Sequence, residues 1–356
     1  GQIRPQKEKE MPKITTEELR EYEGIGGVQR QVGAATEWTD EVLQYCMSGE
    51  NLSGIKLPWP CLDTKFRLQE GSTSLMCGQS GSGKSMLAGQ FALHALEQQY
   101  KCLIISLEMT VRSSIARMVK QRCLVASPGM DEVLDFARWT NGKLWFYRQQ
   151  GSINFKTLLA VVRYTVAKLK VKFIVVDSLM TMGDIPSDDY QGQKRLMLAL
   201  SIAARDLGVH ILLITHARKG LSVDDRLDKF SVAGSADLTN LACSVLLLQK
   251  TPASRRERDA TAPDATFEIA KARHFDTAET TLDLWFDSAS MNYQTKWDSP
   301  RIVGEKDENT VSESEGTPVA TVGEITIVGG TASKASGRRV KVNGGGGRGS
   351  DAVASG

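Results

Sequence analysis

The sequence has few cysteines, almost no net charge and no long hydrophobic segment. Only six of its 356 residues are cysteine, and none belongs to a C-x-x-C pair, the spacing typical of zinc sites and redox motifs. Cys77 and Cys102 lie in apolar runs, which predicts reduced core residues rather than disulfides. No run approaches the roughly 18 consecutive apolar residues that a membrane-spanning helix requires, so we expect no membrane contact.

Charge of neither sign is in clear excess. The chain has 44 Lys and Arg against 42 Asp and Glu, a formal net charge of +2. Any nucleic-acid surface must therefore be local, and the charge argues neither for nor against DNA binding. With 41% hydrophobic residues, the chain is long enough to bury one sizeable core and to carry additional tails.

Apolar, strand-like runs alternate with longer helical stretches from about residue 70 to 295. This alternation predicts an α/β fold with a mostly parallel sheet that helices flank and bury on both faces. Ligands of such folds bind beyond the carboxyl ends of the strands, so functional residues should follow the runs directly. The runs are STSLMC, KCLIISLE, LWFYRQ, KFIVVDS, HILLITHA, SVLLLQK and ATFEIAKAR.

The composition divides the chain into four parts. Residues 1–35 are polar and are interpreted as a linker or as the remnant of an upstream domain. Residues 36–51 contain a stretch with helical spacing, 36–49, which predicts a helix capped by Thr39 or Asp40. The folded domain spans 52–298. Residues 299–356 are first acidic and then basic and glycine-rich, which predicts a disordered tail, either a plain terminus or one that binds protein or nucleic acid.

A glycine-rich stretch, GQSGSGKS, separates two apolar runs. It matches G-x-x-x-x-G-K-[ST], the phosphate-binding P-loop. The loop amides and the following helix dipole would bind the α/β-phosphates, Lys84 would reach the β/γ oxygens, and Ser85 would ligate Mg²⁺. An ordinary Gly/Ser turn is the alternative, but the strand-like TSLMC before it and the helix-like segment after it favour a nucleotide site. The predicted nucleotide-binding residues are Gly78, Gln79, Ser80, Gly81, Ser82, Gly83, Lys84 and Ser85.

Polar residues end three of the later runs, at the edge where ligands are expected. Glu108 could orient and deprotonate the water that attacks the γ-phosphate, although an exposed helix-cap acid is the other interpretation. Asp177 ends a run with the form of a Walker B strand and would hold Mg²⁺ together with Ser85. His216 could sense the γ-phosphate through a hydrogen bond, whereas a lone histidine is more often structural.

Two features near the end of the domain could bind anions. Gly234 and Ser235 lie at a predicted helix start, where backbone amides are free. Lys271 and Arg273 lie two residues apart on a strand, so both project to one face. Such a pair usually marks a solvated edge, but it could be directed at phosphate, and an arginine finger need not serve its own subunit.

Together these motifs resemble a family. GQSGSGKS, SLEM, FIVVDSL, LLITHARK, AGSADL and KAR occur in the order found in the superfamily 4 ring helicases. SLEM matches the DnaB type. The histidine after the fifth strand is similar to the one that the Twinkle-like mitochondrial helicases and the phage primase–helicases have at this position. The resemblance covers about residues 52–298.

The resemblance implies a RecA-like ATPase that uses ATP, or another NTP, with Mg²⁺ and moves 5′→3′ on single-stranded and forked DNA. It implies a homo-oligomer, typically a hexameric ring, with ATP sites between subunits and with Lys271 and Arg273 reaching the neighbour's γ-phosphate. The helix at 36–49 would dock on the next subunit. Primase or DNA polymerase would be further partners, and the location would be intracellular, in the cytoplasm or at the replisome.

The resemblance also implies DNA-binding and base-binding residues. DNA would meet two central loops, one around 183–194 and one around 217–233. Lys250 and Phe286 align roughly with residues that sandwich the adenine. The family usually has a glycine shortly after the finger arginine, and RHFDTAE has none. The predicted DNA-binding residues are Arg218, Lys219, Arg226 and Lys229.

Two other classes of function compete with the helicase. A RecA- or KaiC-like ATPase would assemble on DNA or protein without unwinding, and it shares the P-loop and the glutamate after the second strand. A nucleotide-binding protein without motor activity would show no ATPase stimulation by single-stranded DNA. The K-x-R pair at 271–273 and the linker-like helix favour the ring helicase.

Overall fold

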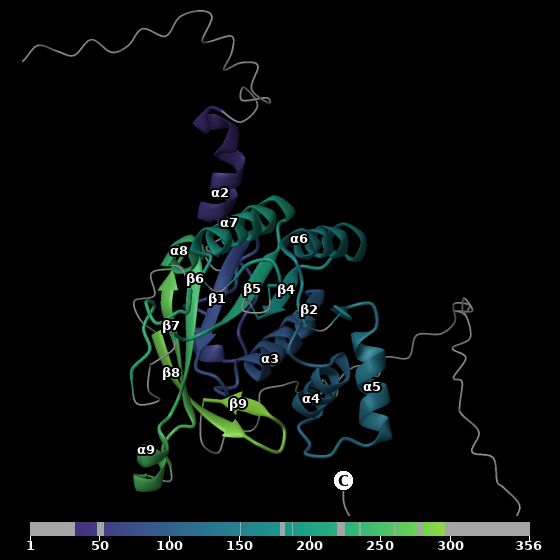
Figure 1. The fold of residues 1–356 in the computed structure, drawn as a ribbon. Helices are drawn as coiled ribbons and strands as arrows, with labels where there is room; N and C mark the ends of the chain where they lie inside the picture. The colour runs from purple at the N-terminus through teal and green to yellow at the C-terminus, as the bar shows by residue number, and fades with distance from the viewer. Residues whose placement is uncertain are drawn as a thin grey trace, which may run out of the picture. The chain divides into compact units, whose positions relative to one another are not determined.

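The fold is described from a computed structural model of the chain (Figure 1). The described residues all belong to one compact unit within Gly1–Lys306. The predicted tail at 299–356 and nearly all of the predicted linker at 1–35 lie outside them. The structure describes residues 33–47, 53–149, 151–178, 182–186, 188–218, 225–234, 236–259, 261–275 and 280–295.

Within these ranges a single sheet has nine strands, in the order β3-β2-β4-β5-β1-β6-β7-β8-β9. From β3 to β6 all neighbours are parallel, and β7, β8 and β9 extend the sheet in antiparallel fashion. The predicted mostly parallel sheet is therefore confirmed, and the seven predicted runs supply β1 to β7. The strands are β1 (Ser72–Gly78), β2 (Cys102–Ser106), β3 (Leu144–Phe146), β4 (Phe173–Asp177), β5 (His210–His216), β6 (Ser244–Lys250), β7 (Ala265–Ala272), β8 (Thr280–Asp287) and β9 (Asn292–Gln294).

Helices cover both faces of the sheet and create two hydrophobic cores (Figure 1). Neighbouring residues of a strand point to opposite faces, so Met76 packs in the core under α3 and Leu75 in the core under α7. No described helix is both long and apolar enough to cross a membrane. The helices are η2 (Ala35–Trp38), α2 (Thr39–Met47), η3 (Pro60–Leu62), α3 (Lys84–Glu97), α4 (Val111–Cys123), α5 (Met130–Thr140), α6 (Phe155–Tyr164), η4 (Thr165–Leu169), α7 (Tyr190–Leu207), α8 (Ala236–Leu241) and α9 (Ala253–Arg258).

The predicted helix near the amino end is present as α2, but its predicted cap is wrong. Thr39 and Asp40 are the first residues of α2 itself, because the chain already turns in η2. The Glu37 carboxylate accepts the amide hydrogen of Ala34 at 2.9 Å and so closes the first turn. The apolar side chains of Trp38, Val42, Leu43 and Met47 are exposed.

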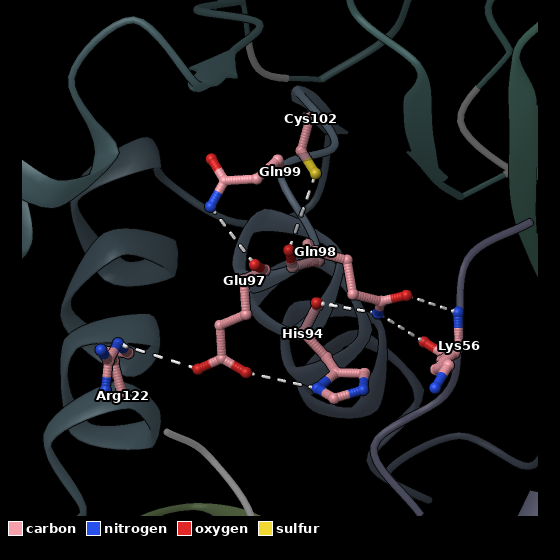
Figure 2. A network of polar contacts seen from close by, with 8 residues as sticks. Lys56, His94, Glu97, Gln98, Gln99, Cys102 and Arg122 are labelled. Carbon is pink, nitrogen blue, oxygen red and sulfur yellow. Dashed lines mark hydrogen bonds and ion pairs between the residues drawn. The ribbon is translucent and has the colours of Figure 1, made fainter. Parts of the chain in front are cut away.

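The carboxyl end of α3 is held by a polar network (Figure 2). The Glu97 carboxylate lies 3.3 Å from Nδ1 of His94 and 4.0 Å from Nε of Arg122 in α4. The Gln98 side chain accepts the amide hydrogen of Lys56 at 2.9 Å and donates to the Lys56 carbonyl at 3.1 Å. These bonds fix the direction of α3, whose other end forms the predicted phosphate site.

Candidate nucleotide site

The GQSGSGKS segment has the backbone that its sequence predicts. β1 ends at Gly78 and α3 begins at Lys84, so the segment is a strand-to-helix loop. Gly81 and Gly83 have φ of 72° and 90°, in the left-handed region that suits glycine. A Cβ at Gly78 would lie 2.4 Å from the carbonyl oxygen of Leu248 in β6, so this glycine is needed for a close approach of two backbones.

Lys84 places a positive charge inside this loop. Its side chain is buried, and its ammonium donates to the carbonyls of Gly78 and Gln79, each at 2.8 Å. Burial lowers the pKa of Lys84 from its usual 10.5, while the nearby Asp177 and Glu108 act to raise it. A buried cation without a full counter-charge favours an anionic ligand, because the ligand would offset the cost of desolvation.

The two predicted Mg²⁺ ligands are brought together. The Ser85 hydroxyl lies beside the buried carboxylate of Asp177 and acts to lower the pKa of that carboxyl. Burial raises the pKa of Asp177 above 3.8, and the Glu108 carboxylate raises it further, although the Ser85 hydroxyl opposes both. A hydroxyl and a carboxylate are the hard oxygen ligands that Mg²⁺ prefers, and one or two protein ligands beside substrate phosphates are usual for this ion. The pair therefore fits Mg²⁺.

Glu108 and His216 lie at the same edge of the sheet, as predicted. The Ser178 hydroxyl donates to Oε1 of Glu108 at 2.8 Å, and Nε2 of His216 lies 3.7 Å from the same oxygen. The register explains this meeting, since Ser106 pairs with Asp177 and Gly78 with His216. Glu108 is still 44% exposed, which leaves it accessible to water.

Ser178 was not among the predicted site residues. It follows Asp177 directly, and its only sequence signal is that position at the end of the predicted Walker B strand. In the structure the Ser178 hydroxyl orients the Glu108 side chain through its hydrogen bond.

Lys271 and Arg273 lie away from their own P-loop. The Lys271 ammonium donates to the carbonyls of Thr239, Asn240 and Ala242 at 2.6, 3.1 and 2.9 Å, and Arg273 donates to the Asn240 carbonyl. Both cations thus cap the carboxyl end of α8. Burial, helped by the charge of Arg273, lowers the pKa of Lys271 to about 8.

The antiparallel direction of β7 explains this position. The amide of Arg273 donates to the Cys243 carbonyl, and the Cys243 amide donates to the Thr73 carbonyl. Arg273 is therefore level with Thr73, and the rise along β1 from Thr73 to Gly78 is about 17 Å. This exceeds the reach of an arginine side chain. The turn after Arg273, at 276–279, lies outside the described residues.

The two predicted base-binding residues lie on β6 and β8, the two strands that flank β7. Lys250 is exposed at the end of β6. Phe286 in β8 packs against Tyr293 in β9, with ring centroids 5.2 Å apart. The Tyr293 hydroxyl donates to the Ser82 carbonyl at 3.0 Å, so Phe286 is one residue removed from the P-loop. Tyr293 was not predicted, because only its contact with the P-loop makes it part of the site.

Three of the predicted DNA-binding residues have local partners. The Arg218 guanidinium donates to the Val232 carbonyl at 3.1 Å, Arg226 lies 3.6 Å from Glu268, and the Lys229 ammonium lies 5.3 Å from the Phe230 ring centre. All three cations are exposed, and Lys219 lies outside the described residues.

The predicted first central loop is shorter than expected. The range 183–194 includes the first turn of α7, which begins at Tyr190 because the Asp189 carboxylate accepts the Gly192 amide hydrogen at 2.8 Å. Near the second loop, Gly234 has φ of 101°, and a Cβ there would lie 2.4 Å from Oε1 of Gln193. Ser235 lies outside the described residues.

Comparison with known proteins identifies the fold. A family model described as an AAA domain matches residues 64–221. The chain is similar to a solved structure whose title describes it as an ATPase domain, with 17% identity, a TM-score of 0.64, and coverage of 74% of this chain and 98% of that chain. It is also similar to a DnaB-like replicative helicase whose title reports its interactions with primase, with 18% identity, a TM-score of 0.61, and coverage of 78% of this chain and 70% of that chain.

No curated protein matches the sequence. The structural likenesses establish that the chain has the RecA-like fold of DnaB-like helicase ATPase domains. The resemblance predicted from the motif order is thus confirmed at the level of the fold.

Proposed function

We propose that this chain is an ATP-dependent, replicative-type DNA helicase of the DnaB type. It assembles as a hexameric ring around single-stranded DNA, moves 5′→3′ and separates forked duplex DNA. The observation that carries the proposal is the meeting of Lys84, Ser85, Asp177, Glu108 and His216 at the carboxyl edge of four neighbouring strands.

Each of these residues has a role in hydrolysis. Lys84 binds the β/γ oxygens of ATP as a point charge, which requires its ammonium to leave the loop carbonyls. Ser85 and Asp177 hold Mg²⁺, which when bound neutralises phosphate charge. Glu108, oriented by Ser178, takes the proton of the attacking water. His216 senses the γ-phosphate through a hydrogen bond and so links its presence to β5 and the loop that follows.

The inter-subunit part of the proposal rests on two features. Arg273 is too far from its own P-loop to act there, so a finger role requires a neighbouring subunit. The exposed apolar side chains of α2 need a partner surface, which suits a linker helix over 36–51 that docks on the next subunit. The helicase domain then comprises 52–298, and primase or DNA polymerase would bind the assembled ring.

A forked-duplex assay tests the proposal. With ATP and Mg²⁺, the protein should unwind a fork that carries a 5′ tail on the loading strand, and a fork with only a 3′ tail should stay paired. Lys84→Ala is the control, because it removes the phosphate-binding charge but leaves the loop amides. DNA-stimulated ATPase without unwinding of either fork would favour a RecA- or KaiC-like ATPase instead. An ATPase insensitive to single-stranded DNA would exclude a motor.

A further inference from the structure

Tyr293 supports the P-loop from the far end of the sequence. Its hydroxyl donates to the Ser82 carbonyl at 3.0 Å, and the residue is 7% exposed. Burial raises the pKa of Tyr293 to about 12, so the hydroxyl keeps its proton and remains a donor over the whole neutral range. The contact joins β9 to the middle of the phosphate-binding motif.

The loop sequence is complementary to this tyrosine. A Cβ at Gly83 would lie 2.3 Å from the Tyr293 hydroxyl, so any other residue there would displace either the ring or the loop. Gly83 also has φ of 90°, the left-handed conformation in which it precedes the first residue of α3 as its N-cap. Gly83 therefore serves two purposes, the left-handed turn and the space that Tyr293 occupies.

The backbone of Tyr293 is held by the helix that the P-loop opens. The Gln90 side chain donates to the Tyr293 carbonyl at 2.9 Å and accepts the Tyr293 amide hydrogen at 3.0 Å. Gln90 is fully buried in α3. The Trp59 indole donates to the same Tyr293 carbonyl at 3.4 Å. These three hydrogen bonds fix the Tyr293 backbone against α3 and Trp59, so the Tyr293 hydroxyl is held in place relative to the loop that leads into α3.

Phe286 connects this support to the predicted base-binding position. It pairs with Tyr293 across β8 and β9, and the two rings pack with centroids 5.2 Å apart. A ligand that contacts Phe286 would therefore act on the Ser82 carbonyl through one intervening side chain, that of Tyr293.

We propose that Tyr293 is a positioning residue that sets the P-loop for phosphate binding, and that Phe286 acts on the loop through Tyr293. The inference rests on the proposed nucleotide site. It adds to that site a coupling in which the base-binding position influences affinity for the phosphate chain, even for a ligand without a base.

Titration calorimetry with Mg·ATP and with Mg·tripolyphosphate, which has no base, tests this coupling. Tyr293→Phe removes only the hydroxyl and leaves the buried Ser82 carbonyl without its donor, so both affinities should fall about fivefold to tenfold. Tyr100→Phe removes a partly buried hydroxyl at the other end of α3 and should change neither. Phe286→Leu should weaken tripolyphosphate binding at least threefold. Because tripolyphosphate has no base, this loss cannot come from a missing stacking contact.

The outcomes separate the alternatives. If Tyr293→Phe and Phe286→Leu both bind ATP more weakly but keep their affinity for tripolyphosphate, the two residues contact only the base. That result would overturn the positioning role. If Tyr293→Phe does not fold, the tripolyphosphate affinity of Phe286→Leu decides alone. A folded unmodified protein that binds neither ligand would overturn the nucleotide site itself, and the coupling with it.

Discussion

Arg273→Ala separates a local structural role from a role at a neighbouring site. In its own subunit Arg273 donates to the Asn240 carbonyl at the end of α8, while Lys271 makes three further bonds to the same helix end. Loss of one exposed hydrogen bond should lower the free energy of unfolding by about 1 kcal/mol or less. The domain should therefore fold, and Arg258→Ala on α9 is a matched control for removing an exposed arginine.

The expected effect on turnover is much larger. If the guanidinium stabilises charge on a neighbour's γ-phosphate, its removal should slow hydrolysis roughly 10³-fold, which corresponds to about 4 kcal/mol. Lys271 cannot replace it, because an ammonium is a point charge and not a planar bidentate donor. Binding of nucleotide to the subunit's own P-loop should stay largely intact, because Arg273 lies about 17 Å along the strand direction from Gly78.

Mixed assemblies provide the assay. Glu108→Gln subunits carry the finger without the base, and Arg273→Ala subunits carry the base without the finger. When the two are mixed, some interfaces combine an intact base with an intact finger, and ATPase activity should reappear at those sites. Unwinding can remain impaired, since the neighbouring sites are inactive.

One result would refute the reasoning. If mixed assemblies demonstrably form, for example by co-purification of differently tagged subunits, and yet recover no hydrolysis, Arg273 does not act across an interface. Its function would then be limited to capping α8.

Three further changes test other parts of the molecule. Glu108→Gln keeps the hydrogen bond from Ser178 but removes the base, so it should bind ATP normally and hydrolyse it at least ~10²-fold more slowly; a normal rate would show that Glu108 only caps a helix. Lys219→Ala with Lys229→Ala should weaken single-stranded DNA binding and flatten its salt dependence, measured by anisotropy, while basal ATPase stays constant; an unchanged slope would contradict backbone contacts by this loop. Burial lowers the pKa of His210 to about 4 from 6.5, so the unfolded chain binds more protons between these values and stability should fall as pH decreases. From pH 7 to 5 the loss should be about 2 kcal/mol in denaturant titrations and should disappear in His210→Gln; an equal loss in that variant would assign it to other groups.

The sequence by itself determined the architecture and the chemical centre of the site. Continuous apolar runs between helical segments require a parallel sheet covered on both faces, and the protein has one. The P-loop pattern is also local, because the glycines and Lys84 act within one turn of chain between β1 and α3. Since parallel strands end at one edge, Glu108, Asp177 and His216 could be placed beside it without knowledge of any side-chain contact.

Only the tertiary structure decided the contacts between distant segments. Tyr293 supports Ser82 from 211 positions away, and no spacing rule connects two residues so far apart. β8 and β9 were missed for a different reason, because β8 mixes polar with apolar residues and β9 has only three residues, so neither forms a continuous apolar run. The location of Arg273 at the edge opposite the P-loop follows from the antiparallel direction of β7, which the order of strands in space decides and the order along the chain does not.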